Sequence, residues 1–375
     1  MSNNTAKLHE PLFHIVKRSA IPKWQSWLVR IGSVIAALIV CGVVTVLLTG
    51  EDPIQVYVKM VEGAVGSERR LWMLAQNTAM LLCVALAVTP AFKMKFWNIG
   101  AEGQVLAGGL ATAACMIFLG DKLSPVVLMI VMVAVSIVAG AVWGLIPAFF
   151  KALWNTNETL FTLMMNYIAM CIVSYFSYEW SVPKGSGHIG VINDTTEAGW
   201  LPAIGGKAYL CNILIVVAIT VFMYIYLRYS KHGYEISVVG ESRNTALYIG
   251  INVKKVIIRT MLLSGAICGL VGFLIVGGVD CTISPTDTIG SIGFTAILVS
   301  WMAKFNPLLM VLTSALVSFL EVGTTQVATG FKIDGSISDI VTAIVLLFVV
   351  GSEFFVNYKI MFRHSSKEVS DRGYH

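Results

Sequence analysis

Apolar residues along this chain are gathered into long blocks instead of alternating with polar ones. Six blocks contain no Asp, Glu, Lys or Arg: 31–49, 71–92, 123–150, 159–178, 208–227 and 260–279. A helix needs roughly 20 mostly apolar residues to cross the hydrocarbon core of a bilayer. Each block has about that length, so the pattern predicts an all-α, polytopic membrane protein.

The full pattern supports about ten transmembrane helices, of which the third and eighth are short or interrupted by glycine. They are predicted near 29–49, 71–91, 99–119, 125–149, 159–179, 208–228, 256–279, 288–303, 306–329 and 336–356. Lys and Arg favour cytoplasmic loops, and with this count the cation-rich loops fall on one side. We therefore expect a cytoplasmic N-terminal segment (1–28), a transmembrane region (29–356), a cytoplasmic tail (357–375) and an extracellular 180–207 loop.

The composition supports the membrane prediction and excludes several functions. Of 375 residues, 57% are hydrophobic and 13% are charged, about half the charged share of a soluble domain. The net charge of +5 lies at the ends of apolar blocks and is not interleaved with aromatics, so no nucleic-acid partner is expected. The seven cysteines are isolated, which argues against a metal or redox site. No phosphate-binding G-x-x-x-x-G-K-[ST] loop occurs. We therefore expect that the chain is not an enzyme and carries no cofactor.

The stretch FWNIGAEGQVLAGG (96–109) places Asn98, Glu102 and Gln104 among glycines at the start of the third segment. Residues 98–103 align with 288–293 as x-I-G-x-x-G. The two copies run in opposite directions through the membrane, as in an inverted repeat of a transporter. One interpretation is a broken helix beside a polar pathway. The other is that Asn98 caps the helix and Glu102 occupies its first turn, near Lys95.

Three further polar residues lie inside predicted spans. An acid in a span is costly to bury, which makes Glu321 a functional candidate, although a hydrogen bond between helices or access to water would also explain it. Asn166 and Tyr167 fit either a pathway or a contact between helices. The candidate pathway residues are therefore Asn98, Glu102, Gln104, Asn166, Tyr167 and Glu321.

The 228–259 loop is the most polar stretch between two spans. We expect a short helix over 234–248, broken near Gly240 and ended by Gly250. A solvated loop helix is one interpretation, and a docking helix for a cytoplasmic partner is the other.

Three stretches resemble a known family. FWNIGAEGQ (96–104) resembles the signature F-N-I-G-x-E-G-Q, with Trp97 as an insertion. NETLFTLMMNYIA (157–169) resembles E-x-x-x-T-x-M-x-N-Y-I-A. VVGESRNTALYIGI (238–251) resembles V-G-x-N-x-x-A-A-x-Y-x-G-I, from which Ser242 and Thr245 depart. Over roughly residues 30–355 the chain is similar to permease subunits of bacterial ABC importers of the branched-chain amino acid, ribose and nucleoside superfamily, most of all to the simple-sugar/nucleoside branch.

The resemblance implies a type II-like import permease in the bacterial cytoplasmic membrane. Its partners would be a second homologous permease, ATP-binding subunits that hold ATP and Mg²⁺, and an extracellular substrate-binding protein or lipoprotein. Nucleosides are expected ahead of simple sugars. The residues implied in coupling to the ATPase, within loop 229–255, are Tyr234, Glu235, Gly240, Glu241, Arg243, Ala246, Tyr248 and Gly250. An ion-coupled secondary transporter and a membrane scaffold are the alternatives, and the charged loop favours the ABC permease.

Overall fold

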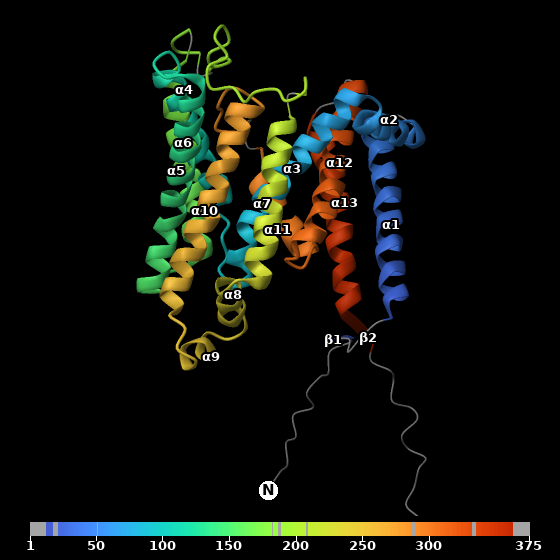
Figure 1. Cartoon of the computed structure of the whole chain (residues 1–375). Helices are drawn as coiled ribbons and strands as arrows, with labels where there is room; N and C mark the ends of the chain where they lie inside the picture. Colours follow the sequence, from blue (N-terminus) through green and yellow to red (C-terminus); the bar gives the residue numbers. More distant parts are fainter. Residues whose placement is uncertain are drawn as a thin grey trace, which may run out of the picture. The chain divides into compact units, whose positions relative to one another are not determined.

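The structure, a computed structural model, describes residues 13–17, 22–50, 52–181, 183–186, 189–207, 209–286, 288, 290–331 and 335–362. Most of the predicted N-terminal segment and most of the tail lie outside this part of the chain. The elements are shown in Figure 1. In order they are β1 (Phe13–Lys17), α1 (Lys23–Thr49), α2 (Pro53–Val65), α3 (Glu68–Lys93), α4 (Ala101–Leu119), α5 (Pro125–Trp154), α6 (Glu158–Glu179), α7 (Leu210–Tyr229), α8 (Lys231–Glu241), α9 (Arg243–Tyr248), α10 (Val253–Gly278), α11 (Ile292–Met302), α12 (Pro307–Phe331), α13 (Gly335–Asn357) and β2 (Tyr358–Phe362).

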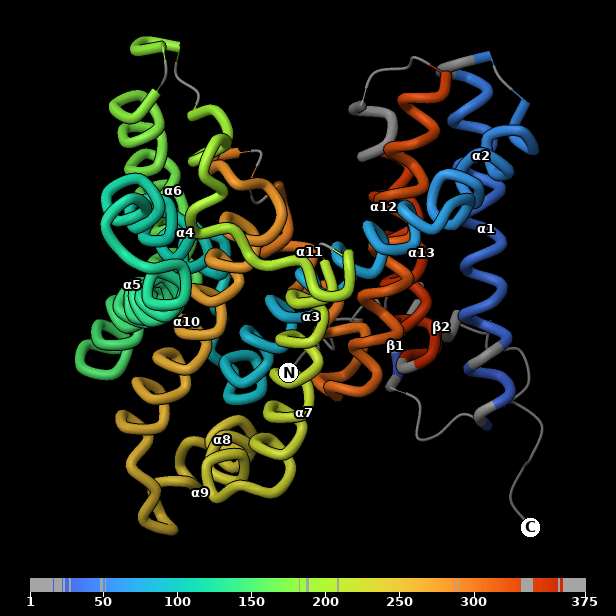
Figure 2. The backbone as a smooth tube through the Cα atoms, turned by 45° about the horizontal axis from the view of Figure 1, so that its top comes forward, coloured from blue at the N-terminus to red at the C-terminus, as the bar shows by residue number. Residues whose placement is uncertain are grey.

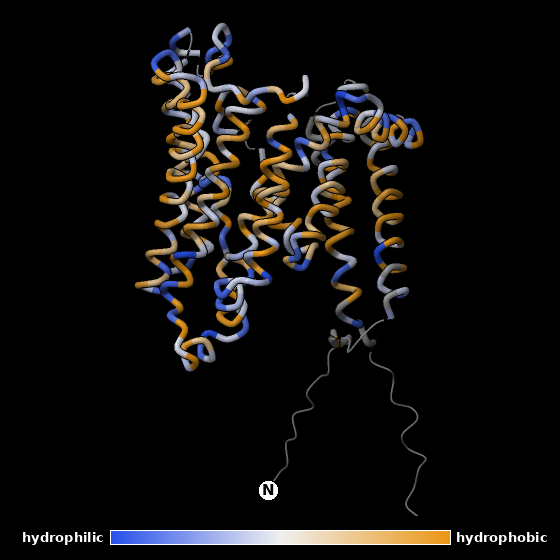
Figure 3. Tube along the Cα trace, viewed as in Figure 1, coloured by the Kyte–Doolittle hydropathy of each residue, from blue (hydrophilic) through white to orange (hydrophobic). Residues whose placement is uncertain are grey.

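The described residues contain eight helices that are long and apolar enough to cross a membrane: α1, α3, α4, α5, α6, α7, α10 and α12. Figure 3 shows their apolar colouring. Two shorter apolar helices, Ile292–Met302 and Ile340–Val356, correspond to the eighth and tenth predicted segments. The 11 residues of α11 span only about 16 Å, roughly half of the hydrocarbon core. The prediction of a helical, multi-pass membrane protein is confirmed, and α11 is a half-helix.

Several boundaries differ from those predicted. Helix α1 begins at Lys23 and not near residue 29, and α4 runs without interruption from Ala101. The predicted loop helix is two helices that divide at Ser242 and not at Gly240. The reason is capping, because the Ser242 side chain accepts from the Thr245 amide and starts a new helix there.

The contacts divide the chain into two compact units, residues 1–57 with 328–375 (unit 1) and residues 58–327 (unit 2). In unit 1, α1 packs against α13, and Arg30 Nη2 lies 2.6 Å from Glu353 Oε1. Beyond these helices β1 pairs antiparallel with β2, from Phe13 opposite Phe362 to Lys17 opposite Tyr358. This strand pair was not predicted.

Helix α10 forms the centre of unit 2 and packs against α3, α4 and α5. Glycines allow this packing: a Cβ added at Gly108, Gly140 or Gly269 would overlap the backbone of a neighbouring helix. Small residues of this kind let membrane helices approach closely without a polar bond. The close approach fixes α4, the helix that carries the FWNIGAEGQ stretch, against α10.

Candidate functional site

Helices α8 and α9 lie together at one end of the unit 2 helices, here called the loop side (Figure 2). Ser230 caps α8, because its Oγ accepts from the Gly233 amide at 3.0 Å. Helix α9 ends at Tyr248, and Gly250, two residues later, has a φ of 82° in the left-handed region. The Ile251 amide reaches back to the Ala246 carbonyl at 2.9 Å, which closes a C-terminal cap of the kind that glycine favours. The predicted helix end, at residue 248 and ahead of Gly250, is confirmed.

A hydrophobic core fastens these two helices to the spans. Ile236 and Val239 of α8 and Ala246 of α9 are buried. They pack with the loop-side ends of α3, α5 and α10 and with the turn after α3, a core made of Ala91, Met94, Phe96, Ala148, Ala152, Ile236, Val239, Ala246, Val253, Val256, Ile257 and Met261. Helices α8 and α9 are therefore a rigid part of unit 2, whereas a solvated loop helix would have no such core.

Gly240 brings α8 directly onto the end of α3. A Cβ at this position would overlap the Lys93 carbonyl and lie 3.3 Å from the Met94 Cα. No other residue type permits this approach, since every other side chain begins with a Cβ. Gly240 therefore lies at a contact with the turn between α3 and α4, and it does not interrupt α8.

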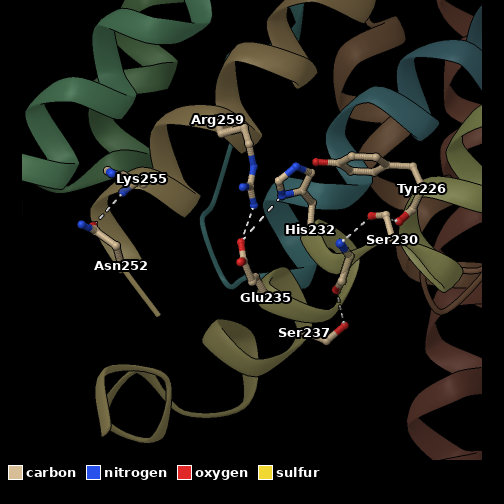
Figure 4. A network of polar contacts seen from close by, with 9 residues as sticks. Tyr226, Ser230, His232, Glu235, Ser237, Asn252, Lys255 and Arg259 are labelled. Carbon is tan, nitrogen blue, oxygen red and sulfur yellow. Dashed lines mark hydrogen bonds and ion pairs between the residues drawn. The ribbon is translucent and has the colours of Figure 1, made fainter. Parts of the chain in front are cut away.

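An ion pair ties α8 to α10 (Figure 4). Arg259 Nη2 of α10 donates to Glu235 Oε2 at 2.8 Å, and His232 Nδ1 lies 3.8 Å from the same oxygen. The Arg259 guanidinium holds the pKa of the Glu235 carboxyl below its ordinary value of 4.5. Glu235, a candidate for coupling to the ATPase, thus contacts this chain's own α10.

Of the remaining candidate coupling residues, Gly240 and Ala246 are buried and the other five face outward. Glu241, Arg243 and Gly250 are exposed, and Tyr234 is 62% and Tyr248 92% exposed. Tyr248 stands between two half-exposed apolar neighbours, Leu247 and Ile249. Residues 247–249, here called the α9 tip, form an apolar surface at the far end of a rigid helix pair.

Glu241 at the end of α8 and Arg243 at the start of α9 line a groove of about 240 Å³. In its wall, Lys151 Nζ lies 2.7 Å from Glu158 Oε2, which joins α5 to α6. The groove reaches the turn after α3, with Lys95 and Phe96 in its lining.

The turn between α3 and α4, residues 94–100, contains Asn98, whose side chain is fully buried. Its Nδ2 donates to Ser264 Oγ of α10 at 3.2 Å. Its Oδ1 accepts from the Gly100 amide at 3.1 Å and from Gln104 Nε2 at 3.2 Å. The N-cap of α4 is Gly100, so the interpretation that Asn98 caps this helix is wrong. Asn98 lies two residues earlier and supports the start of α4 through the Gly100 amide.

Helix α6 supplies the remaining partners of this turn. Asn166 Oδ1 accepts from the Gly103 amide and its Nδ2 donates to the Ile99 carbonyl, both at 2.9 Å. Thr162 Oγ1 accepts from the Ile99 amide at 3.2 Å. Buried backbone groups outside regular helices need such partners. The stretches 96–104 and 157–169, recognised separately in the sequence, are thus hydrogen-bonded to one another. A role for these buried residues in shaping a pathway stays a prediction.

Glu102 meets the start of α11. Its side chain is buried in the first turn of α4, and a Cβ at Gly293 would overlap it. The overlap would be with Glu102 Cγ, so the backbone at the start of α11 packs directly on this side chain. The two stretches of the predicted repeat, 98–103 and 288–293, are therefore in contact.

Tyr167 and Glu321 take no part in these hydrogen bonds. Tyr167 follows Asn166 on α6 and is 56% exposed, and Glu321 lies on an exposed side of α12. Within the described residues, no group of three His, Cys, Asp or Glu side chains could hold a metal ion.

Sequence reasoning missed three residues of the site. Ser264, Lys93 and Arg259 each bond or pack against a predicted candidate. Lys93 and Arg259 look like ordinary cations at the end of a span, and Ser264 is one small polar residue in an apolar helix. Only the fold reveals their partners.

Comparison with known proteins agrees with this arrangement. Residues 71–350 match the family model of the branched-chain amino acid transport system permease component. The glucose ABC transporter permease protein of Haloferax volcanii is 28% identical over 354 residues, 92% of each chain. The nucleoside permease protein of Lactococcus lactis is 29% identical over 82% of this chain and 86% of its own. The guanosine permease protein of Bacillus subtilis is 28% identical over 83% and 89%. A match over three quarters of the chain, including all three converging stretches, shows that it belongs to the family of branched-chain amino acid transport system permease components.

Proposed function

We propose that this chain is the permease subunit of an ATP-driven importer, with α8 and α9 docking a cytoplasmic ATP-binding subunit. The observation that carries the proposal is the α9 tip. Leu247, Tyr248 and Ile249 expose apolar surface on a helix pair that a buried core and the Glu235–Arg259 ion pair hold rigid. Exposed aromatic anchors on a rigid support are typical of docking surfaces.

The partners follow from the family. A permease component of an ABC transporter requires ATP hydrolysis, for which we assign separate ATP-binding subunits. A second homologous permease would complete the pathway, and an extracellular binding protein would deliver the cargo. This chain would bind and move the solute without covalent chemistry.

The cargo that we propose is a nucleoside, ahead of a simple sugar. Two of the relatives above are named as nucleoside and guanosine permeases and one as a glucose permease. The hydrogen-bonding residues buried in unit 2 are mostly neutral, with Asn98, Gln104 and Asn166 at their centre. Neutral polar residues of this kind suit a hydroxyl-rich solute that must also be released.

Competition for uptake in whole cells tests the cargo. Unlabelled inosine or guanosine should suppress uptake of a labelled nucleoside, and leucine should not. Suppression by leucine alone would indicate an amino acid importer, and suppression by ribose alone would indicate a sugar importer. Vanadate should abolish uptake and ionophores should spare it, whereas an ion-coupled secondary transporter would show the reverse.

We propose that both chain ends and the loop side face the cytoplasm of a bacterial cell membrane. In a cysteine-free background, Asp194→Cys in the 189–207 loop should react with a membrane-impermeant thiol reagent in intact cells. Asn244→Cys on α9 should react only after the membrane is opened. Both positions are exposed. Labelling of Asn244→Cys in intact cells would reverse the orientation.

A further inference from the structure

The half-helix α11 packs against α3 and α4, and its loop-side end is held by an aromatic cluster: Phe92, Trp97, Trp301 and Phe305. The rings of Trp97 and Trp301 are 5.5 Å apart and inclined by 31°. Phe92 meets both rings edge-on, at 5.8 and 6.3 Å, and Phe305 meets Trp301 at 5.6 Å. Trp97 is the residue inserted in the family-like signature, and it makes the direct link to α11.

The opposite end of α11 is held by the same stretch of chain. Gly293 packs against Glu102, because a Cβ at Gly293 would overlap Glu102 Cγ and lie 3.1 Å from the Glu102 amide nitrogen. Between these ends, Ser300 Oγ donates to the Ala85 carbonyl of α3 at 2.9 Å. Residues 92–104 thus contact α11 at its first turn and at its last.

The two turns at the aromatic cluster have the same strained cap. Lys95 and Lys304 have φ of 59° and 50°, a left-handed conformation that costs energy for residues other than glycine. At both turns the lysine amide bonds back three residues and the next amide bonds back five, at 2.9–3.0 Å. This cap fixes the direction in which each chain leaves its helix, so the two tryptophans are held facing each other by a rigid backbone.

Residues 92–104 also meet α8. Gly240 lies on the Lys93 carbonyl, and Met94 and Phe96 share a core with Ile236 and Val239. Hydrogen bonds from Asn166 and Ser264 hold the stretch together from α6 and α10. Residues 92–104 therefore contact α8 on one side and the half-helix α11 on the other.

We propose that residues 92–104 transmit a displacement of α8 to α11, and that the Trp97–Trp301 pair is the positioning contact for this step. Helix α11 is suited to move as a unit because it is short and because the described residues between α10 and α11 (279–286, 288, 290 and 291) form no helix. The proposal rests on the proposed function, in which the ATP-binding subunit displaces α8.

The test measures ATP hydrolysis by the complete complex in nanodiscs, as the ratio of rates with and without the cargo-loaded binding protein. Trp97→Leu and Trp301→Leu remove the ring contact and keep an apolar side chain. Each should lower the ratio by about 5-fold or more, the lower range of ordinary allosteric coupling. The double variant should be no worse than either single one, because both remove the same contact.

Two controls separate transmission from folding. Trp97→Phe keeps a ring and should retain most of the ratio. Trp24→Ala removes an exposed tryptophan from α1 and should leave the ratio unchanged. If Trp97→Leu fails to assemble, Trp301→Leu carries the same expectation, since Trp301 is 48% exposed.

A wild-type ratio in Trp97→Leu or Trp301→Leu, or effects of the two that multiply in the double variant, would overturn the proposal. A wild-type chain that neither binds an ATP-binding subunit nor responds to a binding protein would instead refute the proposed function. The two failures are therefore distinguishable.

Discussion

Asn166 shows how one side chain can determine local structure inside a membrane protein. Its two bonds, to the Gly103 amide and the Ile99 carbonyl, satisfy backbone groups in the first turn of α4 and in the chain just before it. The sequence identified Asn98, Gln104 and Asn166 as unusual because polar residues are rare in apolar spans. It could not identify their partners, since Asn166 lies 63 residues from Gly103 and no periodicity links the two.

We predict that Asn166→Leu destabilises the protein. The change leaves the buried Gly103 amide and the partly buried Ile99 carbonyl without these partners, at a cost of about 1–3 kcal/mol for the buried amide. Thermal unfolding in detergent should show a lower Tm. The matched control is Tyr167→Leu at the next position, which is 56% exposed and should change stability by only about 0.5 kcal/mol. Equal Tm values for the two variants would contradict the structural role of Asn166.

The Glu235–Arg259 pair makes a prediction about pH. Because the pKa of Glu235 is lowered in the folded state, its contribution to stability is complete above the ordinary value and is lost as pH falls through the lowered one. The Tm of the wild-type protein should therefore exceed the Tm of Glu235→Gln by a constant margin at pH 6–8. The margin should shrink below about pH 4.5. A margin that is independent of pH down to the acid limit of folding would show that the pair contributes nothing.

At the scale of elements, apolar blocks predict the spans well because lipid imposes length and composition on a membrane helix. The unpredicted α2 is only 13 residues long and includes Lys59 and Glu62, so it has neither the length nor the composition of a span. The division of α8 from α9 was predicted two residues too early because glycine was taken as a helix breaker. In the structure Gly240 allows the close contact of α8 with the end of α3, and Ser242 caps the start of α9.

Gly240→Ala tests the contact of α8 with α3. The new methyl group would overlap the Lys93 carbonyl, so α8 must shift, at about 1–3 kcal/mol for overpacking of this kind. We expect a lower Tm and weaker stimulation of ATP hydrolysis by the binding protein. Gly190→Ala is the matched control because the same methyl group has nothing within 4 Å there. If both variants have the Tm and the stimulation of ATP hydrolysis of the wild type, the contact of α8 with α3 contributes to neither.

At the scale of the whole molecule, three stretches far apart in sequence meet at one turn. Residues 96–104 form the turn and the start of α4, 157–169 brace it from α6, and 238–251 press on it from α8 and α9. The resemblance to a family indicated that the three belong together, and the fold gives the physical reason. The sequence alone could not show that the loop helices are packed, because nine of the twelve residues of their core come from α3, α5, α10 and the turn after α3.

The central claim is that the α9 tip docks an ATP-binding subunit, and site-specific photo-cross-linking in native membranes tests it most directly. A photoreactive amino acid at Tyr248, which is 92% exposed on the tip, should give an adduct with the ATP-binding subunit. The same probe at Tyr175, 63% exposed along the span of α6, should give none. An adduct at Tyr248 alone is the predicted result. No adduct at Tyr248, or equal adducts at both positions, would contradict the claim.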